Sequence, residues 1–223
     1  MTDLVLAPDA WMATAGPAPR VIGVDPSLTC TGVAGDGWAD ALRPKVRRGH
    51  QRLHWLREEV RERTAAADLV VIEGAAYGHG GQAGHHELGG LWWILTQDLW
   101  ERAIPYAVVA PASRIVYAMG VSNPAKDYPR KQRARIAKGM VRDAVAERYG
   151  LECEGPGRYD KADAFILVAM GLHWAGWPLA EVPDTHSRAL GAVPWPEQVP
   201  SLQPSDLRKC GIKFLTGSLV AVE

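Results

Sequence analysis

Short apolar segments alternate with segments of helical periodicity along most of the chain. Apolar runs predict buried strands at residues 21–25, 32–34, 68–73 and 106–109. Apolar positions that recur every three or four residues predict helices at residues 50–66, 86–102, 112–119, 131–149 and 159–173. A tight hairpin turn is expected at Asp36-Gly37, which places a third strand through about residue 41. This order of elements predicts an α/β domain with a mixed central β-sheet flanked by α-helices.

Both ends of the chain depart from this pattern. Residues 1–19 contain three prolines and predict a flexible N-terminal lead-in. Residues 178–223 contain six prolines and little periodicity, which predicts a Pro-rich C-terminal extension. We expect this extension to be an arm that carries a small strand at residues 213–222. A single domain at residues 20–177 therefore lies between two appendages, in agreement with a total of 223 residues.

Composition narrows the classes of function without choosing among them. The 25 basic residues balance the 25 acidic ones, so the chain is no general polycation, although a local basic stripe is enough to bind nucleic acid. The three cysteines are widely spaced and form no CxxC motif, which favours a reducing, cytoplasmic location. The sequence contains neither a secretory signal nor an apolar stretch of about 18 residues, so we expect no membrane partner.

Acidic residues stand at three structurally informative places. Asp25 and Glu73 each end an apolar strand, and an acid there is costly unless something binds it. Asp160 and Asp163 are three residues apart at the start of the last predicted helix, so they share one helical face. Two simpler interpretations stay open: Asp25 as a cap of its own turn, and Asp160 as a partner of the helix dipole.

Four carboxylates at strand ends and at one helix start favour a site for a hard cation. Oxygen ligands of this kind suit Mg²⁺ or Mn²⁺. Two such ions about 4 Å apart hold the attacking and the leaving oxygen of a phosphodiester. The candidate catalytic residues and metal ligands are therefore Asp25, Glu73, Asp160 and Asp163.

Three segments carry a resemblance to a known family. Residues 23–32, Gly-Val-Asp-Pro-Ser-Leu-Thr-Cys-Thr-Gly, resemble the opening motif of RuvC-type Holliday junction resolvases, which belong to the ribonuclease H-like superfamily. Val71-Ile72-Glu73 resembles the second acidic strand of that family, and residues 160–164 resemble its closing helix. The segments occur in the order of the family, and the resemblance covers about residues 20–175.

The resemblance implies a ribonuclease H-like fold and a homodimeric, metal-dependent endonuclease that cleaves Holliday junctions or other branched DNA in recombination and repair. The four acids would bind Mg²⁺ or Mn²⁺, two ions to each active site. Water would be the nucleophile, and the products would carry 5′-phosphate and 3′-hydroxyl ends. The compact length and the C-terminal extension resemble bacteriophage-encoded members.

Basic residues crowd the segment at residues 126–138, where six cations accompany one acid. The family has a basic catalytic residue ahead of its penultimate helix, and Lys126 and Lys131 are the preferred candidates here. The loop at residues 122–130 is longer than the family pattern, so the assignment between them stays open. The remaining candidates for DNA binding are Arg130, Arg133, Arg135, Lys138, Arg47 and Arg48. Some of these side chains would simply form a solvated helix face.

Two aromatic features also have competing interpretations. Tyr77 is near the position of an aromatic residue that the family wedges into the open junction, and the alternative is a core or loop residue. The Trp92-Trp93 pair favours core or dimer packing over a platform for nucleotides.

Other functions remain as alternatives. A nuclease of the same fold would cleave flaps, forks or RNA–DNA hybrids. An actin-like ATPase or sugar kinase has a similar first phosphate loop, but the sequence shows no second loop and no adenosine motif, and the Asp160/Asp163 pair would be unexplained. A non-catalytic junction-binding protein is disfavoured because surplus carboxylates repel DNA unless a metal neutralises them.

Overall fold

The computed structural model describes residues 18–45, 48–75, 85–197 and 199. One mixed sheet has the strand order β3-β2-β1-β4-β5. Its strands are β1 (Val21–Asp25), β2 (Thr31–Gly35), β3 (Trp38–Leu42), β4 (Leu69–Glu73) and β5 (Tyr106–Val109). The strand β1 pairs antiparallel with β2 and parallel with β4, and β5 is parallel to β4. The mixed α/β sheet predicted from the sequence is therefore confirmed.

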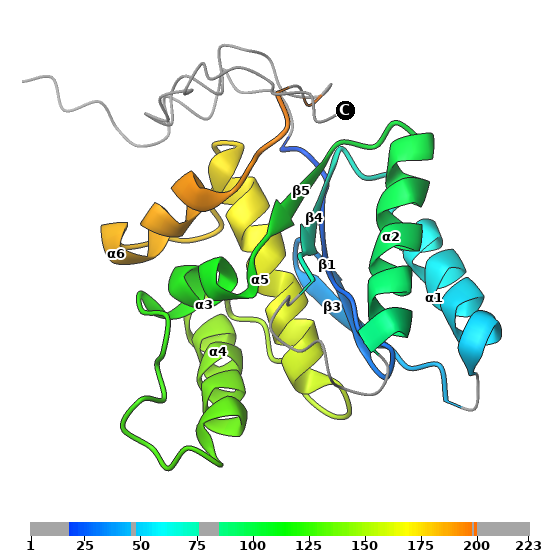
Figure 1. The fold of residues 1–223 in the computed structure, drawn as a ribbon. Helices are drawn as coiled ribbons and strands as arrows, with labels where there is room; N and C mark the ends of the chain where they lie inside the picture. Colours follow the sequence, from blue (N-terminus) through cyan, green and yellow to red (C-terminus); the bar gives the residue numbers. More distant parts are fainter. Residues whose placement is uncertain (1–17, 46–47, 76–84, 198, 200–223) are drawn as a thin grey trace, which may run out of the picture.

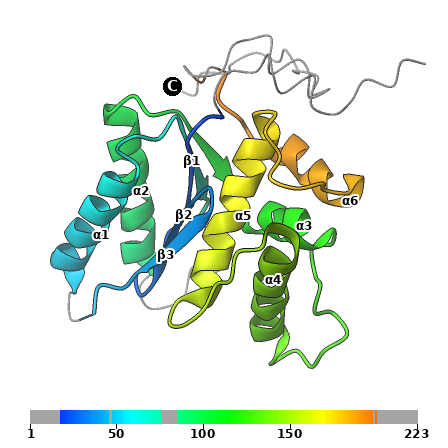
Figure 2. The ribbon, with the colours of Figure 1, turned by 180° about the vertical axis from the view of Figure 1, so that it is seen from behind.

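Helices cover both faces of this sheet. On one face lie α1 (Gly49–Arg63) and α2 (His85–Glu101), and on the other lies α5 (Arg158–Trp174) (Figures 1 and 2). Two further helices, α3 (Pro111–Met119) and α4 (Arg133–Tyr149), pack against α5. Because helices cover both faces, β1 and β4 are nearly continuous apolar runs rather than alternating ones.

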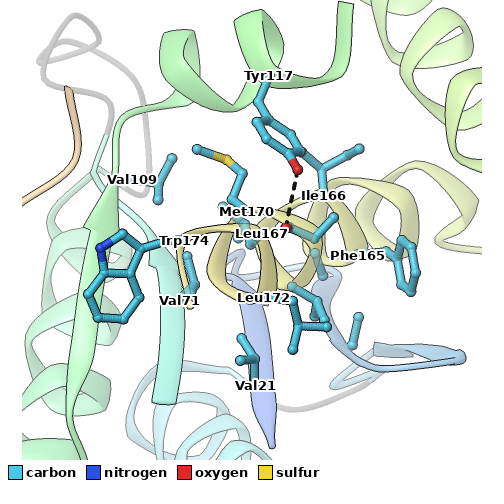
Figure 3. Close-up of a cluster of buried hydrophobic side chains, with 14 of the residues drawn as sticks. Val21, Val71, Val109, Tyr117, Phe165, Ile166, Leu167, Met170, Leu172 and Trp174 are labelled. Carbon is cyan, nitrogen blue, oxygen red and sulfur yellow. Dashed lines mark hydrogen bonds between the residues drawn. The ribbon is translucent and has the colours of Figure 1, made fainter. Parts of the chain in front are cut away.

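The helix α5 is the centre of the larger core cluster. From Ala162 to Leu172 every residue is buried, which explains why the helix is apolar on all sides. Figure 3 shows α5 side chains such as Phe165, Met170 and Trp174 among residues of the sheet and of α3. The Tyr117 hydroxyl of α3 donates a hydrogen bond of 3.2 Å to the Ala169 carbonyl oxygen. This core holds α5 in a defined position against the sheet.

Two glycines let α5 approach the sheet closely. A Cβ atom on Gly23 of β1 would lie 2.1 Å from the Ala164 carbonyl oxygen. A Cβ atom on Gly32 of β2 would lie 2.0 Å from the Asp160 carbonyl oxygen. Any side chain at either position would therefore push the first turns of α5 away from β1 and β2.

Part of the Pro-rich segment folds back onto the domain. It contains α6 (Asp184–Ser187) and the 3₁₀-helix η3 (Arg188–Ala192), both in contact with α3. Trp195 stacks on Trp174 with ring centroids 4.9 Å apart. Residues 184–195 therefore do not extend away as an arm, because α6 and η3 pack against α3 and Trp195 stacks at the end of α5. The strand expected at residues 213–222 and the first 17 residues of the predicted lead-in at residues 1–19 lie outside the described residues.

Most element boundaries agree with the sequence pattern to within two residues. The helix α4 begins at Arg133 rather than at residue 131, after a turn in which the Gln132 amide donates to the Pro129 carbonyl oxygen. In the part of the chain that the structure describes, no helix is both long and apolar enough to cross a membrane.

Candidate functional site

The carboxyl ends of β1 and β4 place two acids side by side. The parallel register pairs Val24 with Ile72, so the next residues, Asp25 and Glu73, are neighbours at one edge of the sheet. The start of α5 crosses this edge, because Gly32 beside Asp25 contacts the backbone of Asp160. Asp163 follows one helical turn later and faces the same site.

All four acids interact electrostatically at this edge. Burial is the main reason why the pKa of Asp25 lies well above its ordinary value, and Glu73, Asp163 and Asp160 raise it further. Burial likewise raises the pKa of Asp163 to about 6, against the opposing effect of Arg114. The structure therefore brings together the four acids that the sequence analysis singled out.

Arg114 of α3 lies between two of these acids. Its Nε–H group donates to Glu73 Oε2, and its Nη1–H group donates to Asp163 Oδ1. Arg114 is only 6% exposed and Asp163 only 2% exposed, so the contacts are shielded from water. Burial alone would lower the pKa of Arg114, but Asp163, Glu73 and Asp25 together raise it above its ordinary value.

A second cation approaches from α4. Lys138 Nζ lies 3.8 Å from Asp160 Oδ1 and 4.0 Å from Asp163 Oδ2. Its side chain is 48% exposed, so it reaches from solvent to the rim of the cluster. Lys138 was expected from the sequence to bind DNA, and the structure places it beside the acids.

Asp25 itself is not used by the turn that follows β1. The turn is held by Ser27 and Thr31: the Thr31 hydroxyl donates to the Ser27 carbonyl oxygen at 2.7 Å and accepts from the Ser27 amide at 3.1 Å. Within the described residues, the Asp25 carboxylate has neither a hydrogen bond nor an ion pair. The turn-cap interpretation of Asp25 therefore finds no support in the described part of the chain.

A small pocket opens next to Asp25 and Glu73. Its volume is about 90 Å³, and its lining consists of Asp25, Pro26, Glu73, Gly74, Ala75, Leu88 and Trp92. The Trp92 indole N–H donates to the Glu73 carbonyl oxygen at 3.1 Å, so α2 is tied to the end of β4. On the other side of the cluster, burial and then the Asp160 carboxylate raise the pKa of the Cys30 thiol to about 12, which keeps that group protonated.

The remaining sequence candidates either form no ion pair or hydrogen bond with the four acids or lie outside the described residues. Lys126 and Lys131 are exposed, and neither forms an ion pair within the described residues. Arg130 and Arg135 are exposed near Lys131, and Arg133 donates to the Tyr128 carbonyl oxygen. Arg48 is exposed immediately before α1. Arg47 and Tyr77 lie outside the described residues.

The side chains suit a metal ion chemically, although the described residues contain no group of three or more His, Cys, Asp or Glu side chains arranged to hold one. Four carboxylates are the donors that hard divalent cations prefer. The guanidinium of Arg114 binds Glu73 and Asp163, two members of that donor set.

Sequence reasoning missed Arg114. It is the only charged residue of α3, whose other residues are Pro, Ala, Ser, Ile, Val, Tyr and Met. An isolated charge in an apolar helix that follows a strand was an available signal. The partners of Arg114, however, depend on how α3 packs against α5, and the pattern of apolar positions in the sequence does not reveal that packing.

Comparisons with known proteins establish the fold. No protein-family model and no curated protein matches the chain. RuvC of Thermus thermophilus matches with a TM-score of 0.50 and 17% identity, over 69% of this chain and 94% of that one. A second structure, T. thermophilus RuvC in complex with a Holliday junction substrate, gives a TM-score of 0.49 and 16% identity, over 74% of this chain and 99% of that one. The yeast mitochondrial Holliday junction resolvase Ydc2 matches with a TM-score of 0.41 and 12% identity, over 82% of this chain and 85% of that one. The first similarity confirms the predicted ribonuclease H-like, RuvC-type fold.

Proposed function

We propose that this protein is a metal-dependent, structure-selective endonuclease that cleaves Holliday junctions or other branched DNA. The observation that carries the proposal is the convergence of Asp25, Glu73, Asp160 and Asp163 at one sheet edge. Ends of parallel strands in layered α/β folds are where ligands bind. The motifs that contain these acids resemble those of RuvC-type resolvases. This resemblance is the reason for proposing branched DNA as the substrate.

The four acids would hold Mg²⁺ or Mn²⁺, which would polarise the scissile phosphate and activate water for in-line attack. The chain itself contributes position. Hydrogen bonds between Ser27 and Thr31 fix the turn after Asp25, and the close contact of Gly32 with α5 fixes Asp160. The resemblance to RuvC-type resolvases implies that hydrolysis would leave 5′-phosphate and 3′-hydroxyl ends.

Basic residues before α4 and in its first turns would bind the DNA backbone. The loop before α4 and its first turns present Lys126, Arg130, Lys131, Arg133 and Arg135, all exposed or half-buried. Arg48 is a further exposed candidate. Such contacts position the phosphates without reading sequence. Contributions of Arg47 and Tyr77 stay predictions from the sequence.

Lys138 competes with Lys126 and Lys131 for the role of the cation that stabilises the transition state. Because Lys138 lies within 4.0 Å of Asp160 and Asp163, we expect Lys138→Ala to lower the cleavage rate about 10–100-fold with little change in junction affinity. The double variant Lys126→Ala/Lys131→Ala should mainly lower affinity and reduce the salt dependence of binding by about two ion equivalents. Single-turnover rates and binding isotherms over a salt series measure both effects. A larger rate loss in the double variant would return the catalytic role to Lys126 and Lys131.

The exposed face of α2 supports the homodimer that the resemblance implies. Trp93 and Trp100 are 69% and 73% exposed and stand seven residues apart on one side of α2. We expect Trp93→Glu/Trp100→Glu to sediment as a monomer, whereas the wild type sediments as a dimer. Tyr128→Glu changes an exposed aromatic residue elsewhere and should leave the dimer intact. A wild-type protein that is monomeric at micromolar concentration would contradict this proposal.

A cleavage assay on defined DNA structures tests the function directly. Four-way junction, fork, flap, RNA–DNA hybrid and plain duplex are incubated with the protein, with Mg²⁺ and with EDTA. We expect paired, symmetric nicks in the four-way junction with Mg²⁺ only. Preferential cleavage of forks, flaps or hybrids would assign another substrate to the same chemistry. Absence of cleavage on every substrate would overturn the proposed function.

A further inference from the structure

Arg114 occupies the interior of the carboxylate cluster. It donates to one oxygen of Glu73 and to one oxygen of Asp163, and it is 6% exposed. A guanidinium keeps its proton in proteins, so this positive charge is permanent. A buried arginine placed between the buried Asp163 and the partly buried Glu73 compensates negative charge that would otherwise be destabilising in the folded protein.

The balance of charge at the site leaves room for one divalent ion. The four acids carry four negative charges when ionised, and Arg114 and Lys138 supply two positive ones. In the DNA-free protein, one divalent cation completes the neutralisation, whereas a second would leave an excess of positive charge. Asp25 is the acid that has no ion pair within the described residues, so it is the natural centre for that one ion.

We propose that Arg114 is a positioning residue that takes the place of one divalent cation, so that the cluster binds one Mg²⁺ or Mn²⁺ instead of two. The proposal rests on the proposed function, because it specifies how that site is loaded. It also differs from the two-ion arrangement expected from the sequence. Arg114 would hold Glu73 and Asp163 in place before the metal ion or DNA arrives.

Counting bound Mn²⁺ in the DNA-free protein tests this proposal. We expect about one Mn²⁺ per chain for the wild type and for Arg114→Lys, which keeps the charge. Arg114→Met removes the charge and frees one oxygen each of Glu73 and Asp163. One Mn²⁺ then leaves the site with one uncompensated negative charge, so we expect this variant to bind a second Mn²⁺. Without metal, Arg114→Met should melt at a lower temperature than the wild type, because Glu73 and Asp163 then repel each other. Saturating Mn²⁺ should raise the melting temperature of this variant by more than it raises that of the wild type.

A matched control separates this role from ordinary packing. Arg102 pairs with the buried Asp98 at 2.6 Å, on the other face of the sheet. Arg102→Met should lower the melting temperature without changing the number of bound Mn²⁺ ions and without rescue by Mn²⁺. Should Arg114→Met fail to fold, the wild-type protein still decides, because about one Mn²⁺ per chain in the absence of DNA is itself the expected result.

The outcomes distinguish this inference from the proposed function. Two Mn²⁺ ions on the DNA-free wild type would overturn the role of Arg114 and leave the nuclease intact. An unchanged count and affinity for Mn²⁺ in a folded Arg114→Met variant would also overturn it. Wild-type protein that binds no Mn²⁺ and cleaves DNA in EDTA would instead overturn the metal dependence of the proposed function.

Discussion

Asp25→Asn is expected to lower the rate of junction cleavage by at least about 100-fold, because loss of a direct metal ligand should cost no less than loss of a residue that supports one. Binding to the junction should be kept or become tighter, since the substitution removes a negative charge beside the phosphates. The variant should also melt at a higher temperature without metal. Burial and three neighbouring carboxylates disfavour the ionised form of Asp25, which is why its pKa is raised.

The control for this variant is Asp36→Asn. Asp36 is exposed in the hairpin between β2 and β3, at the opposite end of β1 from Asp25. Asparagine suits the same turn, so cleavage and melting temperature should stay close to those of the wild type. Single-turnover cleavage, binding measured in Ca²⁺ or EDTA, and thermal melting make the comparison. Normal Mg²⁺-dependent cleavage by Asp25→Asn would show that the site lies elsewhere.

Gly32→Ala is expected to impair both the fold and the site. The new Cβ atom would lie 2.0 Å from the Asp160 carbonyl oxygen, so the first turn of α5 must move. Forcing an extra carbon into a packed contact typically destabilises a protein by about 1–3 kcal/mol. For a chain of this size that lowers the melting temperature by about 2–4 °C for each kcal/mol. A displacement of about 1 Å at Asp160 should also lower the cleavage rate about 100-fold.

Gly90→Ala is the matched control for the added methyl group. Gly90 lies within α2, and a Cβ atom there would meet nothing within 4 Å. Alanine favours a helix interior by roughly 0.5–1 kcal/mol, so this variant should be slightly more stable than the wild type. Melting curves and single-turnover rates of both variants decide the matter. If Gly32→Ala cleaves and melts like Gly90→Ala, the close approach of α5 does not position the site.

The sequence alone sufficed for the strands, the main helices and the four acids of the candidate site. Apolar runs such as residues 69–72 can be recognised as strands in the sequence, because helices cover both faces of the sheet and every residue of this run is buried. The acids stand out because they interrupt or directly follow those runs, where a carboxylate without a partner is unfavourable. Glycine at positions 23 and 32 was visible in the motif, but the backbone contacts that require it were not.

The interior of the site was decided by tertiary structure. Arg114 stands 49 residues before Asp163 and 41 residues after Glu73, and only the packing of α3 against α5 brings the three together. Tertiary structure likewise distinguished Lys138, which lies beside Asp160 and Asp163, from the five other basic residues of the segment at residues 126–138. Long-range contacts of this kind follow from how helices dock, and local periodicity carries no information about docking.

The sequence by itself determined which residues end at the edge of the sheet, because the period of apolar positions sets where strands and helices begin and end. Tertiary structure decided what surrounds the four carboxylates: an arginine between two of them, a lysine at the rim, and no ion pair for Asp25 within the described residues. The physical reason is that the cost of a buried charge depends on every group packed against it, and the charged groups of this site come from five separate elements of the chain.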